Sequence, residues 1–159
     1  MKRVVLISDN HSLKAPLEYV REKYSEYDYF LHCGDSELPK YLLGGFAAVC
    51  GNNDRYGEYP QNLVINIGEH KVYVTHGHRD FFMGKLEMLA AKAKAKGCDV
   101  ACFGHTHVPF DGTVDGVRLL NPGSAWHNRD GSPASFMLLE FDGDGVNAEI
   151  VRIPKNGIF

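Results

Sequence analysis

The feature that most constrains this chain is a short apolar segment that ends in a cluster of Asp, Asn or His residues. It occurs five times, after the apolar residues at 4–7, 29–33, 47–50, 72–75 and 100–103. The clusters are Ser8-Asp9-Asn10-His11, Gly34-Asp35, Gly51-Asn52-Asn53-Asp54, His76-Gly77-His78 and Gly104-His105-Thr106-His107. In open α/β sheets, ligands bind in the crevice outside the carboxyl ends of the strands. The pattern therefore predicts that five turns converge on one site.

The rest of the chain alternates strands and helices at first and then consists mainly of hairpins. Its periodicity predicts strands at 3–7, 28–33, 46–50, 62–67, 71–75, 99–103, 135–141 and 146–153, a hairpin across 112–120, and helices at 12–24, 37–43 and 84–96. This order favours an α/β fold with a mixed sheet system and helices outside it. We expect His32, inside a predicted strand, to lie in the core, and His70, in a predicted turn, to be solvated. Because 159 residues show no linker and no repeat, we expect one domain, 1–159.

Composition excludes several classes of protein. Hydrophobic residues make up 44% and charged residues 23%, which is typical of a globular chain and not of a disordered one. No apolar run approaches the roughly 18 residues of a membrane span, and the N-terminal segment does not resemble a signal peptide. A net charge of −3 argues against non-specific binding to nucleic acid or anionic membranes. The cysteines form no Cys-x-x-Cys pair, so we expect reduced core thiols in a cytoplasmic protein, at Cys33, Cys50, Cys98 and Cys102.

Each polar cluster alone is compatible with an ordinary turn or helix cap, but together they predict a metal site. They offer two carboxylates, one amide oxygen and four imidazoles: Asp9, Asp35, Asn52, His11, His76, His105 and His107. Seven such groups exceed the needs of one tetrahedral ion and suit two divalent ions of higher coordination number that share a carboxylate. We expect manganese first, with zinc, iron, nickel and magnesium as alternatives.

The ordered series Asp9-x-His11, Gly34-Asp35, Gly51-Asn52, His76-Gly77 and Gly104-His105-x-His107 resembles the calcineurin-like metallophosphoesterase superfamily. Asn121-Pro122-Gly123-Ser124 and the lack of insertions resemble its small single-domain YfcE-type phosphodiesterases, over about residues 3–125. The resemblance implies a four-layer α/β/β/α sandwich of two mixed β-sheets flanked by helices. It also implies the ligand roles: a first ion held by Asp9, His11 and His107, a second held by Asn52, His76 and His105, and Asp35 as the bridge. His76 is preferred to His78 because the family's ligand precedes the glycine.

The function implied by the resemblance is hydrolysis of small phosphodiesters. In that mechanism two metal ions lower the pKa of a bridging water, and the resulting hydroxide attacks phosphorus. The candidates for phosphate binding or proton transfer are Asn53, Asp54 and His78. Many superfamily members carry a histidine where this chain has Asn53, and an asparagine cannot act as a general acid. We therefore expect weak action on esters with poor leaving groups unless His78 or a metal-bound water replaces the missing acid.

Two other functions remain open. One is a phosphomonoesterase that uses the same site. The other is a non-catalytic interaction scaffold of the same fold, like the retromer scaffold subunit, although the presence of all seven expected ligands argues against it. We expect a small phosphodiester as the partner, no membrane and no long nucleic-acid polymer. The apolar pair Ile158-Phe159 suggests contacts with a second copy of the chain.

Overall fold

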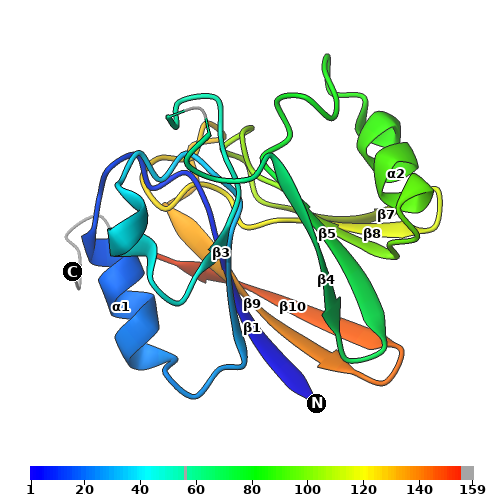
Figure 1. The fold of residues 1–159 in the computed structure, drawn as a ribbon, viewed down its shortest axis with the longest axis horizontal. Helices are drawn as coiled ribbons and strands as arrows, with labels where there is room; N and C mark the ends of the chain where they lie inside the picture. Colours follow the sequence, from blue (N-terminus) through cyan, green and yellow to red (C-terminus); the bar gives the residue numbers. More distant parts are fainter. Residues whose placement is uncertain (56, 155–159) are drawn as a thin grey trace.

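The computed structural model describes residues 1–55 and 57–154 as two mixed β-sheets of five strands each (Figure 1). The first sheet has the strand order β10-β9-β1-β2-β3, and the second has the order β4-β5-β6-β8-β7. Strands of the first sheet are β1 (Lys2–Ile7), β2 (Tyr29–His32), β3 (Ala47–Ala48), β9 (Ser135–Asp142) and β10 (Gly145–Arg152). Strands of the second are β4 (Asn62–Ile67), β5 (His70–Thr75), β6 (Val100–Cys102), β7 (Phe110–Val114) and β8 (Val117–Asn121).

Parallel strands lie in the middle of each sheet and decide where the functional turns emerge. In the first sheet β1, β2 and β3 run parallel, with β9 and β10 antiparallel beside β1. In the second sheet β5, β6 and β8 run parallel, between the antiparallel strands β4 and β7. The carboxyl ends of neighbouring parallel strands share one edge of their sheet. The turns after β1, β2 and β3 therefore leave one sheet together, and those after β5 and β6 leave the other together.

Three apolar layers hold the two sheets and their helices together. Between the sheets, side chains such as Val4 and Leu6 of β1 pack with Val72 and Val74 of β5. On the outer face of the first sheet, α1 (Ala15–Lys23) packs its Leu17 and Val20 in the same cluster as Val5 and Ile7. On the outer face of the second, α2 (Leu86–Ala95) packs its Leu89, Ala90 and Ala93 in the same cluster as Tyr73 and Ala101. The expected four-layer sandwich is confirmed, with few helices in its outer layers.

Both faces of β1 are buried, which explains its uninterrupted apolar sequence. Val4 and Leu6 face the second sheet, while Val5 and Ile7 face α1, and all four are fully buried. A strand covered on both sides is expected to be apolar at every position rather than at alternate ones. Each such side chain contributes about 1.5–3 kcal/mol of burial free energy. The second half of β1 is therefore a rigid base for the residues that follow it.

Three predicted elements are shorter in the structure because the chain around them forms loops. The helix predicted at 12–24 begins only at Ala15, after a turn in which His11 and Ser12 have positive φ. The helix predicted at 37–43 is a 3₁₀ helix, η1 (Lys40–Leu43), which follows Pro39 in an extended conformation. The strand predicted at 46–50 pairs only through Ala47–Ala48, since Cys50 N–H donates instead to the Pro60 carbonyl.

His70 is not solvated as predicted. Its side chain is buried, with Nδ1 2.6 Å from Asp99 Oδ2 and Nε2 3.0 Å from the Gly143 carbonyl oxygen. It lies at the start of β5, and Gly143 lies in the β9–β10 turn, so the ring ties the two sheets together at one end. The prediction for His32 is confirmed, because its ring is fully buried.

Two further features concern contact of the chain with a membrane and with a second copy of itself. Among the described residues, no helix has the length and apolar character needed to cross a bilayer. Ile158 and Phe159, on which the expected contact with a second copy depends, lie outside the described residues.

Candidate metal centre

The turns after β1, β2, β3, β5 and β6 meet where the edges of the two sheets face each other (Figure 1). Direct contacts between side chains of different turns establish this. Asp9, after β1 of the first sheet, has Oδ1 3.2 Å from Nε2 of His107, which follows β6 of the second sheet. His76, after β5, has Nε2 3.4 Å from Oδ2 of Asp35, which follows β2. The site is therefore assembled from both sheets.

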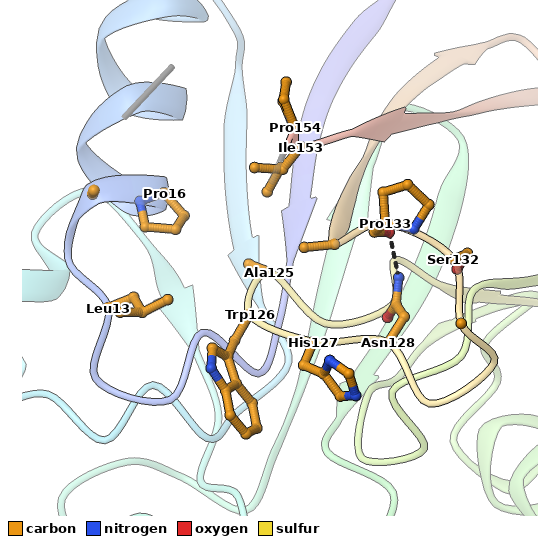
Figure 2. A pocket seen from close by; sticks show the side chains of 13 residues that line it. Leu13, Pro16, Ala125, Trp126, His127, Asn128, Ser132, Pro133, Ile153 and Pro154 are labelled. Carbon is orange, nitrogen blue, oxygen red and sulfur yellow. Dashed lines mark hydrogen bonds between the residues drawn. The ribbon is translucent and has the colours of Figure 1, made fainter. Parts of the chain in front are cut away.

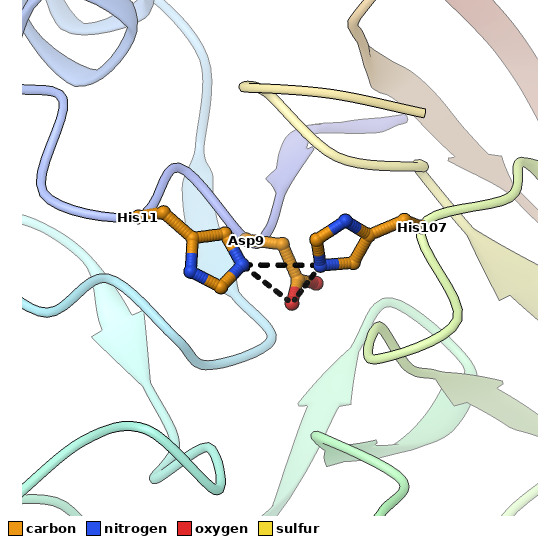
Figure 3. A group of neighbouring side chains, drawn as sticks. All are labelled: Asp9, His11 and His107. Carbon is orange, nitrogen blue, oxygen red and sulfur yellow. Dashed lines mark hydrogen bonds and ion pairs between the residues drawn. The ribbon is translucent and has the colours of Figure 1, made fainter. Parts of the chain in front are cut away.

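A first group of candidate ligands consists of Asp9, His11 and His107 (Figure 3). One ligand atom from each lies within 4.8 Å of the others. The two imidazole Nε2 atoms are 3.0 Å apart, and Asp9 Oδ1 lies 3.8 Å from that of His11. Asp9 and His107 are buried, whereas His11 is partly exposed, so the group has one side open to solvent.

A second group shares a carboxylate with the first and consists of Asp9, Asp35 and His76. His76 Nε2 lies 3.9 Å from Asp9 Oδ1, in addition to its 3.4 Å separation from Asp35 Oδ2. The same Asp35 oxygen is 4.0 Å from His11 Nε2. Asp35 thus lies between His11 of the first group and His76 of the second.

Asn52 and His105 complete the set of seven residues expected from the sequence. Asn52 Oδ1 lies 2.9 Å from His76 Nε2 and 3.2 Å from His105 Nδ1. The structure therefore brings all seven side chains into one cluster. Asn52 and His105 adjoin the second group through His76.

Hydrogen bonds on the outer side of three imidazoles direct their other nitrogens inward. The Nδ1 atom of His76 lies 2.7 Å from the Cys33 carbonyl oxygen, and that of His107 lies 3.0 Å from the His127 carbonyl oxygen. His11 Nδ1 lies 2.5 Å from Glu37 Oε2. Since carbonyl and carboxylate oxygens only accept, each Nδ1 carries a proton, and each Nε2 faces the cluster, where it can bind a cation in its deprotonated form.

Glu37 is a residue that the sequence analysis missed. It lies two positions after Asp35, in a turn where both residues have positive φ. That short spacing was its only sequence signal, and a single partly exposed glutamate carries no distinctive motif. Its contact with His11 is the arrangement that orients metal-binding histidines in many proteins.

The donor set fits divalent metal ions. His76 Nε2 lies 2.9 Å from Asn52 Oδ1 and 3.4 Å from Asp35 Oδ2, so three atoms able to bind a metal ion converge there. Asp9 Oδ1 is buried and accepts no hydrogen bond from the residues that the structure describes. A buried carboxylate oxygen without a donor is costly unless a cation compensates it. Nitrogen and oxygen donors of this kind suit manganese, zinc, iron and nickel.

Both carboxylates are held in their ionised form. Burial raises the pKa of Asp35, but hydrogen bonds from His76 and Asn53 outweigh it and bring the pKa well below its usual range. Burial also opposes ionisation of Asp9, yet contacts with His107 and His76 lower its pKa overall. Metal ligation requires deprotonated carboxylates, so the site is prepared for cations at neutral pH.

The protonation of the neighbouring histidines follows from the same charges. Burial lowers the pKa of His76, but the two adjacent carboxylates outweigh this and raise it. Burial, followed by repulsion from His76, lowers the pKa of both His78 and His105. His105 is therefore neutral at pH 7, as a metal ligand must be.

Two glycines allow the backbone to approach the carboxylates closely. A Cβ atom at Gly51 would collide with the Asp35 carboxylate, and one at Gly104 would collide with Ser8 Oγ and Asp9 Oδ2. Glycine is therefore required at these two motif positions, because any side chain would collide with a carboxylate. A larger residue at either would displace a candidate ligand.

The three predicted catalytic residues lie beside the cluster in different settings. Asn53 donates to Asp35 through both its backbone N–H and its side-chain amide, at 2.8 and 2.9 Å. Asp54 accepts from the backbone N–H groups of Asp35, Glu37 and Gly51 at 2.8–2.9 Å, so it fixes two of the turns. His78 is half-buried, with its ring centroid 5.3 Å from that of His76. Its Nδ1 has no partner among the described residues.

Comparison with known proteins identifies the family. The model of the calcineurin-like phosphoesterase superfamily domain matches residues 1–144. The chain belongs to this superfamily. The probable metallophosphoesterase YsnB of Bacillus subtilis is 35% identical over 158 residues, covering 98% of this chain and 94% of the relative. The resemblance seen in the sequence motifs is confirmed.

Two solved structures show the same fold. A predicted phosphoesterase from Streptococcus pneumoniae superposes with a TM-score of 0.88 at 30% identity, covering 95% of this chain and 89% of the other. Vps29 from Entamoeba histolytica, solved in complex with Zn²⁺, gives a TM-score of 0.73 at 26% identity, covering 94% and 98%. The family and the donor cluster together indicate a metal-dependent phosphoesterase.

Proposed function

We propose that this protein is a dinuclear metal-dependent phosphodiesterase that hydrolyses small phosphodiesters. The observation that carries the proposal is the convergence of seven side chains with nitrogen and oxygen donors on one place between the two sheets. Asp9, His11 and His107 would hold one ion, and Asn52, His76 and His105 the other. Asp35 would bridge them, because its Oδ2 lies between His11 and His76.

Residues of this chain would position the metal ligands and the phosphoryl group. When bound, two divalent ions would supply an activated water and neutralise charge on the phosphoryl oxygens. Asn53 holds both oxygens of Asp35 in place. Asp54 fixes the backbone at Asp35, after β2, and at Gly51, after β3. His78, with an unbonded Nδ1 beside the second group, is our candidate for a hydrogen bond to the phosphoryl group or a proton to the leaving oxygen.

A matrix of metals and substrates tests this function. Protein stripped with a chelator is reconstituted with Mn²⁺, Zn²⁺, Fe²⁺, Ni²⁺ or Mg²⁺, and assayed on bis-p-nitrophenyl phosphate and p-nitrophenyl phosphate. We expect metal-dependent turnover, greatest with Mn²⁺ and greater on the diester, with two ions bound per chain. A faster reaction on the monoester would identify a phosphomonoesterase. Diester hydrolysis by the stripped protein would contradict the proposal.

The similarity to Vps29 supports a second candidate, a non-catalytic scaffold of the same fold. The Entamoeba Vps29 structure contains Zn²⁺, so a relative of this fold binds a divalent metal ion too. The two functions therefore differ in turnover and not in metal binding alone. Two tightly bound ions with no hydrolysis of either ester would favour the scaffold.

The proposal also covers the compartment and the partners of the protein. All four cysteines are free and buried, which supports a reducing compartment such as the cytoplasm. We propose a small diester as the partner in preference to a long nucleic acid, because the net charge of −3 provides little attraction for a polyanion. Self-association stays a prediction, to be measured by sedimentation velocity.

A further inference from the structure

A pocket of about 580 Å³, whose lining residues are drawn in Figure 2, includes Trp126 and His127 in its wall. Its walls are mostly apolar and come from Leu13 and the start of α1, the 125–134 loop and the two residues that follow β10. They include Leu13, Pro16, Trp126, Pro133 and Ile153. This volume lies within the range of pockets that bind small molecules. None of the seven candidate ligands lines it, so it is a separate compartment next to the metal centre.

Trp126 connects this pocket to the metal centre. Its ring centroid is 5.1 Å from that of His11 and 6.2 Å from that of His107, both in the first group. At the same time the side chain is 52% exposed and lines the pocket. The indole is large and half-exposed, and its ring lies near those of two candidate ligands. It is therefore placed to contact a molecule bound at the metal centre.

The position of Trp126 is fixed by the structure of the metal centre. Ser124 Oγ donates to the Asp9 carbonyl oxygen at 2.7 Å. The Ser124 hydroxyl oxygen itself accepts from the backbone N–H groups of Trp126 and His127, at 3.0 and 2.9 Å. The backbone that carries the indole is therefore tied through the Ser124 hydroxyl to Asp9, the first candidate ligand in the chain. A platform held in this way loses little conformational entropy on binding.

We propose that this pocket binds a flat aromatic group, of the nucleobase type, on one ester arm of the phosphodiester, with Trp126 as its stacking platform. The inference rests on the proposed function and defines its substrate class. Indole faces stack on bases independently of base identity. The His127 ring, 5.7 Å from the indole, is also exposed and offers a hydrogen-bonding edge. Apolar walls around these two rings favour a flat, weakly polar group over a charged one.

Two substrates with the same leaving group isolate the pocket from the metal centre. Thymidine 5′-(p-nitrophenyl phosphate) and methyl p-nitrophenyl phosphate both release p-nitrophenolate, and differ only in the retained arm. We expect the wild type to prefer the thymidine ester in kcat/KM. In Trp126→Ala this preference should fall about ten- to a hundredfold, mainly through KM. Trp126→Phe should retain most of it, and Tyr41→Ala, which removes another exposed ring, should leave the preference intact.

Binding can be followed without turnover, because Trp126 is the only tryptophan in the chain. Thymidine 5′-monophosphate should quench its fluorescence in the Zn²⁺-loaded protein, whereas methyl phosphate should not. A thymidine preference that is absent, or unchanged in Trp126→Ala, overturns the inference while hydrolysis of both esters upholds the proposed function. Hydrolysis of neither ester, with quenching by the nucleotide alone, would contradict the function but keep the pocket. If Trp126→Ala instead changes only self-association in sedimentation velocity, the face contacts a second copy and the inference is wrong.

Discussion

At the scale of single residues, Asp35 is the carboxylate that we propose as the bridge between two ions. Its oxygens lie between His11 and His76 and also accept both hydrogen bonds from Asn53. We expect Asp35→Ala, and the isosteric Asp35→Asn, to lower diester turnover at least a hundredfold, because the carboxylate proposed to bridge the two ions is lost. Calorimetric titration with Mn²⁺ should show one binding event weakened or absent. Asp111→Asn, a change at an exposed carboxylate paired with Arg118, is the matched control. Near-normal turnover in Asp35→Asn would refute a dinuclear site.

Glu37 acts on the cluster through His11. A neutral amide in its place still accepts a hydrogen bond from Nδ1 but no longer supplies a negative charge. We expect Glu37→Gln to weaken metal affinity about 10- to 100-fold, the usual cost of altering a residue that orients a ligand. The measurement is competition for Mn²⁺ against a chromogenic chelator. Glu18→Gln, an exposed position on α1, should have no effect. Equal affinities in the two variants would show that Glu37 does not position His11.

Asn53 occupies the position at which the superfamily resemblance implies a histidine, so Asn53→His introduces a titratable group there. We expect Asn53→His to raise hydrolysis of phenyl phosphate about tenfold, because a general acid matters most for a poor leaving group. The gain on p-nitrophenyl phosphate should be smaller, since p-nitrophenolate leaves readily without a proton. Comparing the two rates in one preparation checks the prediction. An equal gain on both esters would point to phosphate binding instead of proton transfer.

At the scale of elements, His32 in β2 makes the fold sensitive to acid. Its Nε2 lies 2.7 Å from Asn10 Oδ1, and its Nδ1 accepts from the Gly34 backbone N–H. Burial lowers the pKa of His32 from 6.5 to about 4. Between these values the unfolded chain binds a proton that the folded one does not, so stability falls as the pH falls from 6.5 towards 4. The loss is up to about 3 kcal/mol.

Denaturant unfolding of the metal-stripped protein at pH 7.5 and pH 4.5 measures this effect. His32→Gln keeps a donor near Asn10 but has no titration in this range. We expect the difference in unfolding free energy between the two pH values to be smaller in His32→Gln than in the wild type by at least 1 kcal/mol. An unchanged difference would assign the acid sensitivity to other groups.

The elements themselves were largely predictable, whereas the turns between them were not. Buried β1 and the β4–β5 hairpin follow from apolar periodicity, because each position reports which face is covered. The segments after β1 and β2 do not, since they depart from regular structure to place His11 and Glu37. His70 was mispredicted for the same reason, because its partners Asp99 and Gly143 lie 29 and 73 positions away. Contacts at such distances leave no local pattern.

The candidate site divides in a similar way. The seven donors were predictable because they follow strand ends in a familiar order, and the structure brings them together. Glu37 and Trp126 carry no motif and became visible only through their contacts with His11. The candidate ligands thus follow from local sequence, while the residues that would orient them and line the proposed substrate pocket depend on tertiary structure.

At the scale of the whole molecule, metal binding should stabilise the fold. In the absence of a cation, like-charged carboxylates and lone pairs from both sheets face each other across the site. We expect Mn²⁺ at 100 times its Kd to raise the unfolding free energy by about 2.7 kcal/mol per site, and a chelator to reverse the gain. Thermal unfolding with and without metal measures this. Asp35→Asn should show a smaller rise, and an identical rise in that variant would place the bound ion elsewhere.

Because β9 and β10 complete the first sheet from the far end of the chain, a break between β3 and β4 would divide that sheet between two fragments and leave neither with a full set of donors. Two such pieces, expressed separately, could regain hydrolysis only by docking onto each other. Ester cleavage would then report reassembly, because the rate of colour formation would be proportional to the fraction of fragments that had associated.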